Sequence, residues 1–238
     1  MGQTKQLLRL GDKTVIRHCI DALVGGGVNE ILVVVAACGN RLAPHLRGLP
    51  VSIAVNETPY SDMAESVRAG LKQLRHYTSS VLVCLSDHPL VSAETIRFLL
   101  REHREFPDAI IIPEYDGRRG HPSLFPRSLL DEIFSGVTLR DIVRRDPARV
   151  RLAPVRDEGV VLDMDTRKDY AMILKRYQSN SRYIPEFTLK FSSGEQSYFT
   201  LGGLDHEDPG NQGNCKKEGG HGREKDGKNR ADKGNSKS

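Results

Sequence analysis

Several features that would place this chain in a special class of protein are missing from its sequence. No two of its four cysteines form a CxxC pair, which argues against a zinc site. No apolar run is long enough to span a bilayer, and the start carries no signal-peptide pattern. These absences predict a protein of the reducing cytoplasm without a membrane partner. The cysteines are Cys19, Cys38, Cys84 and Cys215.

The sequence also has little excess of charge of either sign. It contains 35 Lys and Arg against 31 Asp and Glu, a net charge of +4. A mild basic excess can attract polyanionic substrates such as nucleotides, but a solvated surface with a basic tail explains it more simply. We therefore predict no nucleic-acid partner.

Apolar residues are plentiful enough for one α/β domain. They make up 38% of the 238 residues, which suffices for a well-packed core. No sustained apolar period continues past residue 178, and from Asp205 onward almost nothing is apolar. We predict a folded domain over residues 1–177 and a low-complexity, disordered tail over residues 178–238.

Helical and strand patterns alternate along the first part of the chain. Such alternation predicts right-handed crossovers and a mostly parallel sheet between two helical layers. Asp116-Gly117 then predicts a hairpin. Helices are expected over 14–24, 40–46, 61–74, 92–104, 127–134, 139–145 and 163–177, and strands over 31–35, 51–56, 81–85, 108–113, 149–155 and 159–162.

The strand over residues 81–85 is apolar without alternation, which is typical of a strand buried on both faces. It ends at Ser86-Asp87-His88-Pro89. Ligands of open α/β sheets bind outside the carboxyl ends of the strands, so Asp87 stands where a metal or a phosphate would be met. The alternative is that Asp87 caps the next helix or forms an Asx-turn.

A second acidic pair, Asp163 and Asp165, lies at another strand-to-helix junction. Two carboxylates at one sheet edge suit Mg²⁺, which takes one or two carboxylates together with substrate phosphates. Capping of the helix that begins near Thr166 is the competing interpretation for both residues.

Three further segments carry groups that suit a phosphate-bearing ligand. Met1-Gly2-x-x-Lys5 joins a flexible glycine to an ammonium, although a terminal lysine is usually only solvated. Asn56 and Ser66 could contact a nucleotide or be ordinary polar positions. Gly120-His121-Pro122 adds a titratable ring to a loop, where a lone histidine is more often structural.

Taken together and in order, these motifs resemble the MobA-like nucleotidyltransferases. They are most similar to the molybdenum-cofactor cytidylyltransferase (MocA-type) branch, and the resemblance covers roughly residues 1–177. The set includes, besides the segments above, Met63-x-x-Ser66-x-x-x-Gly70, Asp87-x-Pro89-Leu-Val91 and Asp163-Met-Asp-Thr166.

The resemblance implies a Rossmann-like three-layer fold and Mg²⁺-dependent transfer of CMP or GMP from CTP or GTP to a phosphate acceptor such as molybdopterin. It implies that Lys5 and Asp87 are catalytic. It also implies that Asp87, together with Asp165 or Asp163, holds the metal and that Asp87 contacts the NTP. It also places the loop of Gly120, His121 and Pro122 on the acceptor side. The implied nucleotide contacts are Gly2, Lys5, Asn56 and Ser66.

The chain departs from the family pattern at its start. Members usually carry a strand and a glycine-rich loop before Met-Gly-x-x-Lys, so we expect this chain to be truncated at its N-terminus. The base cannot be read without that loop. One alternative is a catalytically impaired remnant that acts as a cofactor-binding or chaperone-like module, with a molybdoenzyme or its chaperone as partner. The other is a nucleotidyltransferase that acts on a sugar phosphate or another small phosphate.

Overall fold

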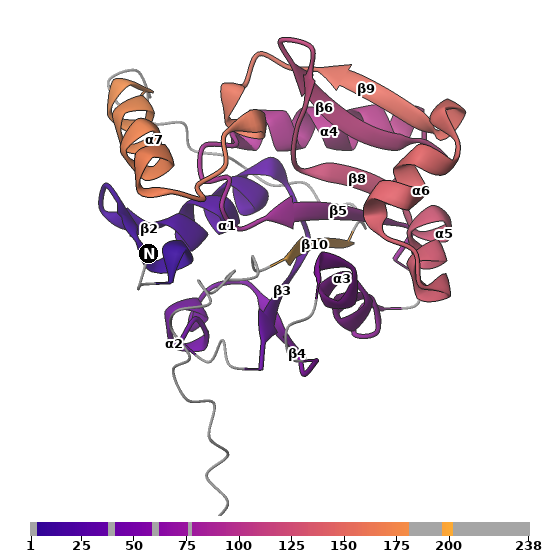
Figure 1. Cartoon of the computed structure of the whole chain (residues 1–238), viewed down its shortest axis with the longest axis horizontal. Coiled ribbons are helices and arrows are strands. Elements are labelled where there is room, and N and C mark those ends of the chain that lie inside the picture. Colours follow the sequence, from indigo (N-terminus) through magenta and orange to yellow (C-terminus); the bar gives the residue numbers. More distant parts are fainter. Residues whose placement is uncertain (1–3, 38–40, 59–61, 76–77, 181–196, 202–238) are drawn as a thin grey trace, which may run out of the picture. The chain divides into compact units, whose positions relative to one another are not determined.

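A mixed sheet of eight strands forms the centre of the fold (Figure 1). The computed structural model describes residues 4–37, 41–58, 62–75, 78–180 and 197–201, and all of them belong to one compact unit, Met1–His206. The strand order is β4 (Ser52–Asn56), β3 (Glu30–Ala36), β10 (Ser197–Leu201), β5 (Ser80–Leu85), β8 (Ser123–Pro126), β6 (Ile110–Tyr115) and β7 (Arg118–Arg119).

The first four strands of this order are parallel to one another. Strand β8 is antiparallel to both β5 and β6, and β9 (Val150–Pro154) pairs with β6 in parallel. The predicted hairpin at Asp116-Gly117 is present between β6 and β7, and both turn residues have positive φ, 49° and 71°. The expected mostly parallel α/β/α fold is therefore confirmed.

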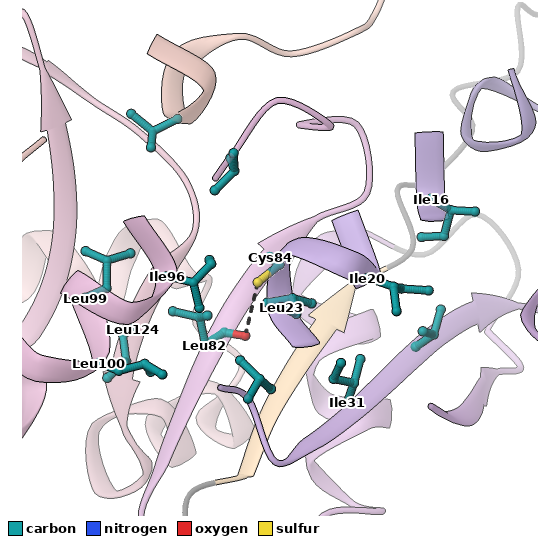
Figure 2. Close-up of a cluster of buried hydrophobic side chains, with 14 of the residues drawn as sticks. Ile16, Ile20, Leu23, Ile31, Leu82, Cys84, Ile96, Leu99, Leu100 and Leu124 are labelled. Atoms are coloured by element: carbon teal, nitrogen blue, oxygen red, sulfur yellow. Dashed lines mark hydrogen bonds between the residues drawn. The ribbon is translucent and has the colours of Figure 1, made fainter. Parts of the chain in front are cut away.

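Helices cover both faces of the sheet, because its inner strands are apolar on both sides. Val33 and Val35 of β3 pack with α1 (Val15–Gly26) and α4 (Ala93–Glu105), and Leu82 and Cys84 of β5 join the same cluster (Figure 2). Alternate β3 residues, Leu32 and Val34, face the other layer. That layer contains α3 (Met63–Leu71), α5 (Arg127–Leu130) and α6 (Leu139–Arg145).

The N-terminal segment and the last helix form a third packed unit. A short 3-10 turn, η1 (Lys5–Leu7), leads into a hairpin of β1 (Arg9–Leu10) and β2 (Lys13–Thr14). Helix α7 (Arg167–Asn180) packs on this hairpin through Ile173 and the neighbouring Met164, which contact Leu10 and Val15. At the turn, Gly11 has a φ of 68° and lies so close to the Tyr177 ring that a side chain would collide with it.

One predicted strand is wrong. Residues 159–162 lie mostly in a 3-10 turn, η4 (Glu158–Val161), and pair with no strand of the described chain. The cause is Asp157, whose carboxylate accepts hydrogen bonds from the Gly159 amide at 2.9 Å and from the Ser92 amide at 2.8 Å. These bonds curl the chain before Val160 and Leu162, and both residues are buried without a sheet partner.

The remaining elements, α2 (Ala43–Leu46), η2 (Asp131–Ser135) and η3 (Pro147–Arg149), are short.

Two parts of the segment predicted to lack structure are regular elements. Helix α7 continues to Asn180, and β10 lies in the middle of the sheet, with Thr200 opposite Val33 on one side and Cys84 on the other. The remainder of the predicted tail, residues 181–196 and 202–238, lies outside the described residues, so the division at residue 177 stays a prediction.

In the part of the chain that the structure describes, no helix is both long enough and apolar enough to cross a membrane.

Candidate active site

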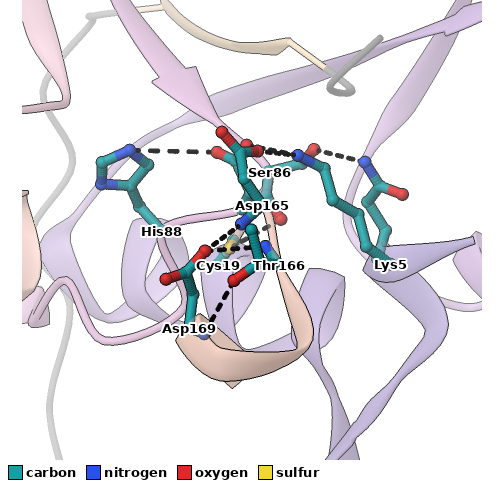
Figure 3. Close-up of polar contacts among 9 residues, drawn as sticks. Lys5, Cys19, Ser86, His88, Asp165, Thr166 and Asp169 are labelled. Atoms are coloured by element: carbon teal, nitrogen blue, oxygen red, sulfur yellow. Dashed lines mark hydrogen bonds and ion pairs between the residues drawn. The ribbon is translucent and has the colours of Figure 1, made fainter. Parts of the chain in front are cut away.

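Lys5, Asp87 and Asp165 meet at the carboxyl end of strand β5. Figure 3 labels Lys5 and Asp165 of this group, together with Ser86. The Lys5 ammonium lies 2.8 Å from Asp87 Oδ2 and 2.8 Å from Asp165 Oδ1. The Lys5 and Asp87 side chains are 14% and 13% exposed, whereas Asp165 is 63% exposed. The group thus opens to solvent on the Asp165 side, where a ligand can enter.

Three separate segments of the chain build this group. The η1 turn supplies Lys5, and the next residue fixes that turn against the end of β5, since Gln6 Nε2 donates to Ser86 Oγ at 3.3 Å. Gln6 is 1% exposed and Ser86 is 0% exposed. The docking of α7 on the hairpin brings Asp165 to the same place, and Tyr170 of α7 donates to the Arg9 carbonyl at 2.6 Å.

Asp165 does not cap helix α7, although capping was the competing interpretation. The Asp169 carboxylate accepts from the Thr166 amide at 2.7 Å and from the Asp165 amide at 3.2 Å, and the Thr166 hydroxyl accepts from the Asp169 amide at 3.2 Å. The hydrogen bonds from the Thr166 hydroxyl and the two amides lower the pKa of Asp169. Because Thr166 and Asp169 satisfy the start of the helix, the Asp165 carboxylate is left for Lys5.

Asp87 does not cap a helix either, because another residue caps helix α4. Helix α4 begins after Ser92, whose hydroxyl accepts from the Thr95 amide at 3.1 Å. The Asp87 carboxylate instead bonds Lys5 through Oδ2, and its buried Oδ1 has no hydrogen-bond partner among the described residues. One oxygen of Asp87 is therefore buried beside the His88 ring, 3.9 Å from its Nε2, without a hydrogen bond from the described residues.

The two carboxylates keep the Lys5 side chain charged. Burial by itself lowers the pKa of Lys5, but the hydrogen bonds to Asp165 and Asp87 outweigh burial and raise the pKa above its usual value. A lysine held in this state acts as a fixed positive charge and not as a base.

These side chains fit a divalent cation. The Lys5 ammonium already occupies a position between two carboxylate oxygens, as a stand-in cation would. Across the described residues, no group of three or more His, Cys, Asp or Glu side chains could hold a metal. Two carboxylates completed by water and substrate phosphates is the donor set typical of Mg²⁺.

Asn56 and Ser66, predicted to touch a nucleotide, lie together at the end of β4 and in α3. Asn56 Nδ2 donates to Ser66 Oγ at 3.2 Å, and Asn56 Oδ1 accepts from the Thr58 amide at 3.1 Å. Both side chains are buried, at 3% and 4% exposure. The pair orders the chain that leaves β4, and its contact with a nucleotide stays a prediction.

The loop Gly120-His121-Pro122 packs against η4 and the chain after β5. Gly120 approaches the Val160 backbone so closely that a side chain would not fit, and the His121 amide donates to the Val160 carbonyl at 2.8 Å. The His121 ring lies edge-on to His88, with centroids 5.5 Å apart. Burial, with a smaller contribution from His88, lowers the pKa of His121 to about 4, so the ring is neutral at pH 7.

His88 is a residue whose importance the sequence did not reveal. It is 7% exposed, lies 3.9 Å from the Asp87 carboxylate through Nε2, and is 3.4 Å from the Gly159 carbonyl through Nδ1. With His121 it lines a cavity of about 20 Å³, enough for one water molecule. In the sequence, only the position of His88 directly after Asp87 indicated that it lies near the site.

Two predicted site residues are not joined to this group. Gly2 lies outside the described residues. Asp163 is exposed and forms no hydrogen bond or ion pair with any residue that the structure describes, because the chain turns inward at Met164, which is 0% exposed, before Asp165. Asp165 is therefore the better placed of the two acidic residues, and the part of Asp163 stays a prediction.

Comparison with known proteins identifies the family of the chain. Residues 1–150 match the model of the MobA-like NTP transferase domain. The chain belongs to the MobA-like NTP transferase family. It is accordingly a nucleotidyltransferase by family, as the motifs predicted. The chain is also 30% identical to nicotine blue oxidoreductase of Paenarthrobacter nicotinovorans over 173 residues, which cover 68% of this chain and 83% of that protein.

Solved structures share the fold. One is Rv0371c of Mycobacterium tuberculosis H37Rv in complex with manganese, at 23% identity and a TM-score of 0.60, over 73% of this chain and 93% of that chain. Another is molybdopterin-guanine dinucleotide biosynthesis protein A of Archaeoglobus fulgidus, at 18% identity and a TM-score of 0.55, over 76% and 92%. At these identities the likeness supports the fold.

Proposed function

We propose that this MobA-like transferase moves CMP or GMP from CTP or GTP to the phosphate of a molybdopterin-type acceptor, with Mg²⁺ as cofactor. The observation that carries the proposal is the convergence of Lys5, Asp87 and Asp165 at the carboxyl end of β5, with 2.8 Å between the ammonium and each carboxylate. The manganese complex of Rv0371c and the likeness to a molybdopterin-guanine dinucleotide biosynthesis protein support it.

In the proposed reaction an oxygen of the acceptor phosphate attacks the α-phosphorus of the nucleotide. The bond between the α-phosphorus and the bridging oxygen breaks, and pyrophosphate leaves with the electron pair. Such a transfer needs positioning and charge neutralisation more than a covalent nucleophile. Asp87 and Asp165 would hold Mg²⁺, which would supply positive charge to neutralise the triphosphate.

Each residue of the group has a distinct part in this reaction. Asp87 and Asp165 hold the cation, and Lys5 neutralises phosphate charge. Asn56 and Ser66 shape the nucleotide side, and the loop of Gly120, His121 and Pro122 lines the acceptor side. A neutral, buried His121 contributes shape and no charge at pH 7.

The test is pyrophosphate release by the purified 238-residue chain, with CTP or GTP, Mg²⁺, and molybdopterin or a sugar phosphate as acceptor. We expect release that requires one nucleotide, Mg²⁺ and molybdopterin together. Release only with a sugar phosphate would keep the transferase and replace the acceptor. No release under any combination would leave the impaired, cofactor-binding remnant as the alternative.

A second candidate function follows from the 30% identity to nicotine blue oxidoreductase, which extends over 83% of that protein. The alternative is an oxidoreductase that acts on nicotine blue or a related compound. The same purified chain is assayed for redox conversion of nicotine blue, with an electron donor or acceptor supplied in the assay. Conversion of nicotine blue without pyrophosphate release in the first assay would favour this function over nucleotidyl transfer.

A further inference from the structure

The Lys5 side chain occupies the place that a metal ion would need. Its ammonium is 2.8 Å from an oxygen of each carboxylate, so it bridges Asp87 and Asp165 as a small cation does. Two carboxylates and one ammonium leave a net charge of −1 in the group. Half of the negative charge of the two carboxylates is thus neutralised before any metal arrives.

The backbone that carries Lys5 is fixed, whereas its side chain can rotate toward solvent. Gln6 ties the η1 turn to Ser86 at the end of β5, and the Leu8 amide closes the turn on the Lys5 carbonyl at 3.2 Å. The aliphatic stem of Lys5 is long and rotatable, and Asp165 on the open side is 63% exposed. The ammonium can therefore swing toward solvent without movement of the sheet.

A divalent ion and the Lys5 ammonium cannot both occupy this site without strong electrostatic repulsion. A metal on the same two oxygens would lie within a few ångströms of the Lys5 charge, and like charges at that range repel strongly near a protein surface. A nucleotide triphosphate removes the conflict, because its phosphates offer the ammonium a new anionic partner while they supply further ligands to the metal.

We propose that Lys5 holds the cation position of the nucleotide-free protein and that a divalent ion enters only together with phosphates that draw Lys5 away. This inference rests on the proposed function, because it assumes that Asp87 and Asp165 are the metal ligands. It assigns Lys5 a second role, that of an internal counter-ion which couples metal binding to nucleotide binding.

The test is Mn²⁺ affinity without any nucleotide, measured from the signal of free Mn²⁺ in electron paramagnetic resonance. Lys5→Met removes the charge and keeps the length of the side chain, so it should bind Mn²⁺ at least about tenfold more tightly than the wild type. Lys5→Arg keeps the charge and should bind as weakly as the wild type. Lys5→Gln makes the same comparison if Lys5→Met does not fold.

Lys13→Met is the matched control, because Lys13 is also ion-paired at 2.8 Å but with Asp21, on the β2 and α1 side. It should leave Mn²⁺ affinity unchanged. Adding Asp87→Asn to Lys5→Met should abolish the gain, which locates the bound ion at the carboxylates.

Two results would overturn the inference, and they differ in what they say about the proposed function. Equal Mn²⁺ affinity of the wild type and Lys5→Met, lost in both on Asp87→Asn, would refute the counter-ion role and keep the metal site. Mn²⁺ affinity that does not depend on Asp87 in either protein would refute the metal site as well.

Discussion

Asp87 and Asp165 both stand where a carboxylate commonly caps a helix, and neither does so here. Ser92 caps α4, and Thr166 with Asp169 caps α7. A carboxylate relieved of its local hydrogen bonds is free to bind a cation, which in this structure is the Lys5 ammonium. At the scale of single residues, a carboxylate that can bind a cation is recognised here because a neighbouring residue caps the helix in its place.

His121 makes a prediction about pH at the same scale. Its pKa in the folded protein is about 4, below the usual value of 6.5 for the unfolded chain, so the unfolded state binds the proton first as pH falls. Stability contributed by the neutral ring is therefore present above pH 6.5 and lost between pH 6.5 and 4. The loss is up to about 3 kcal/mol.

Urea unfolding of the wild type and His121→Phe at several pH values checks this prediction. The free energy of unfolding of the variant should depend less on pH in that window, whatever its absolute stability. His45→Gln is the control, because His45 is exposed, and it should keep the wild-type slope. Parallel slopes for the wild type and His121→Phe would show that His121 is protonated as easily in the folded state.

Most elements follow from patterns within a few residues, and the exceptions follow from distant partners. Helix α6, Leu139–Arg145, begins and ends where its apolar spacing predicted, and the buried run of β5 was read directly from its sequence. The strand expected over residues 159–162 failed because Asp157 bonds Ser92, 65 residues away, and bends the chain. No local period marks Ser197–Leu201, whose pairing depends on β3 and β5.

The central place of β10 gives a prediction at the scale of elements. Thr200→Pro removes a backbone donor from a strand that is paired on both sides, so it should destabilise the sheet by about 1–3 kcal/mol. Thr200→Val keeps the donor and is the control. Amide hydrogen exchange should speed up in β3 and β5 for the proline variant alone. Unchanged exchange there would show that β10 contributes little to the sheet in solution.

At the scale of the whole molecule, the candidate site depends on contacts between segments that lie far apart in the sequence. Lys5 and Asp165 are 160 residues apart and meet only because α7 packs on the β1–β2 hairpin through Leu10, Val15 and Ile173. The sequence could indicate that Asp87 lies at a strand end. It could not indicate which of Asp163 and Asp165, both before the last helix, would reach Asp87, since that choice follows from the docking of α7.

In the proposed reaction Asp87 binds the cation that makes nucleotidyl transfer possible. The most direct measurement is the rate of Mg²⁺-dependent pyrophosphate release by Asp87→Asn, beside the wild type and the control Asp12→Asn, which changes an exposed turn. We expect Asp87→Asn to lose about two orders of magnitude or more in rate while its circular dichroism spectrum and Asp12→Asn activity stay as in the wild type. Near wild-type turnover by a folded Asp87→Asn protein would show that Asp87 does not bind the cation needed for nucleotidyl transfer.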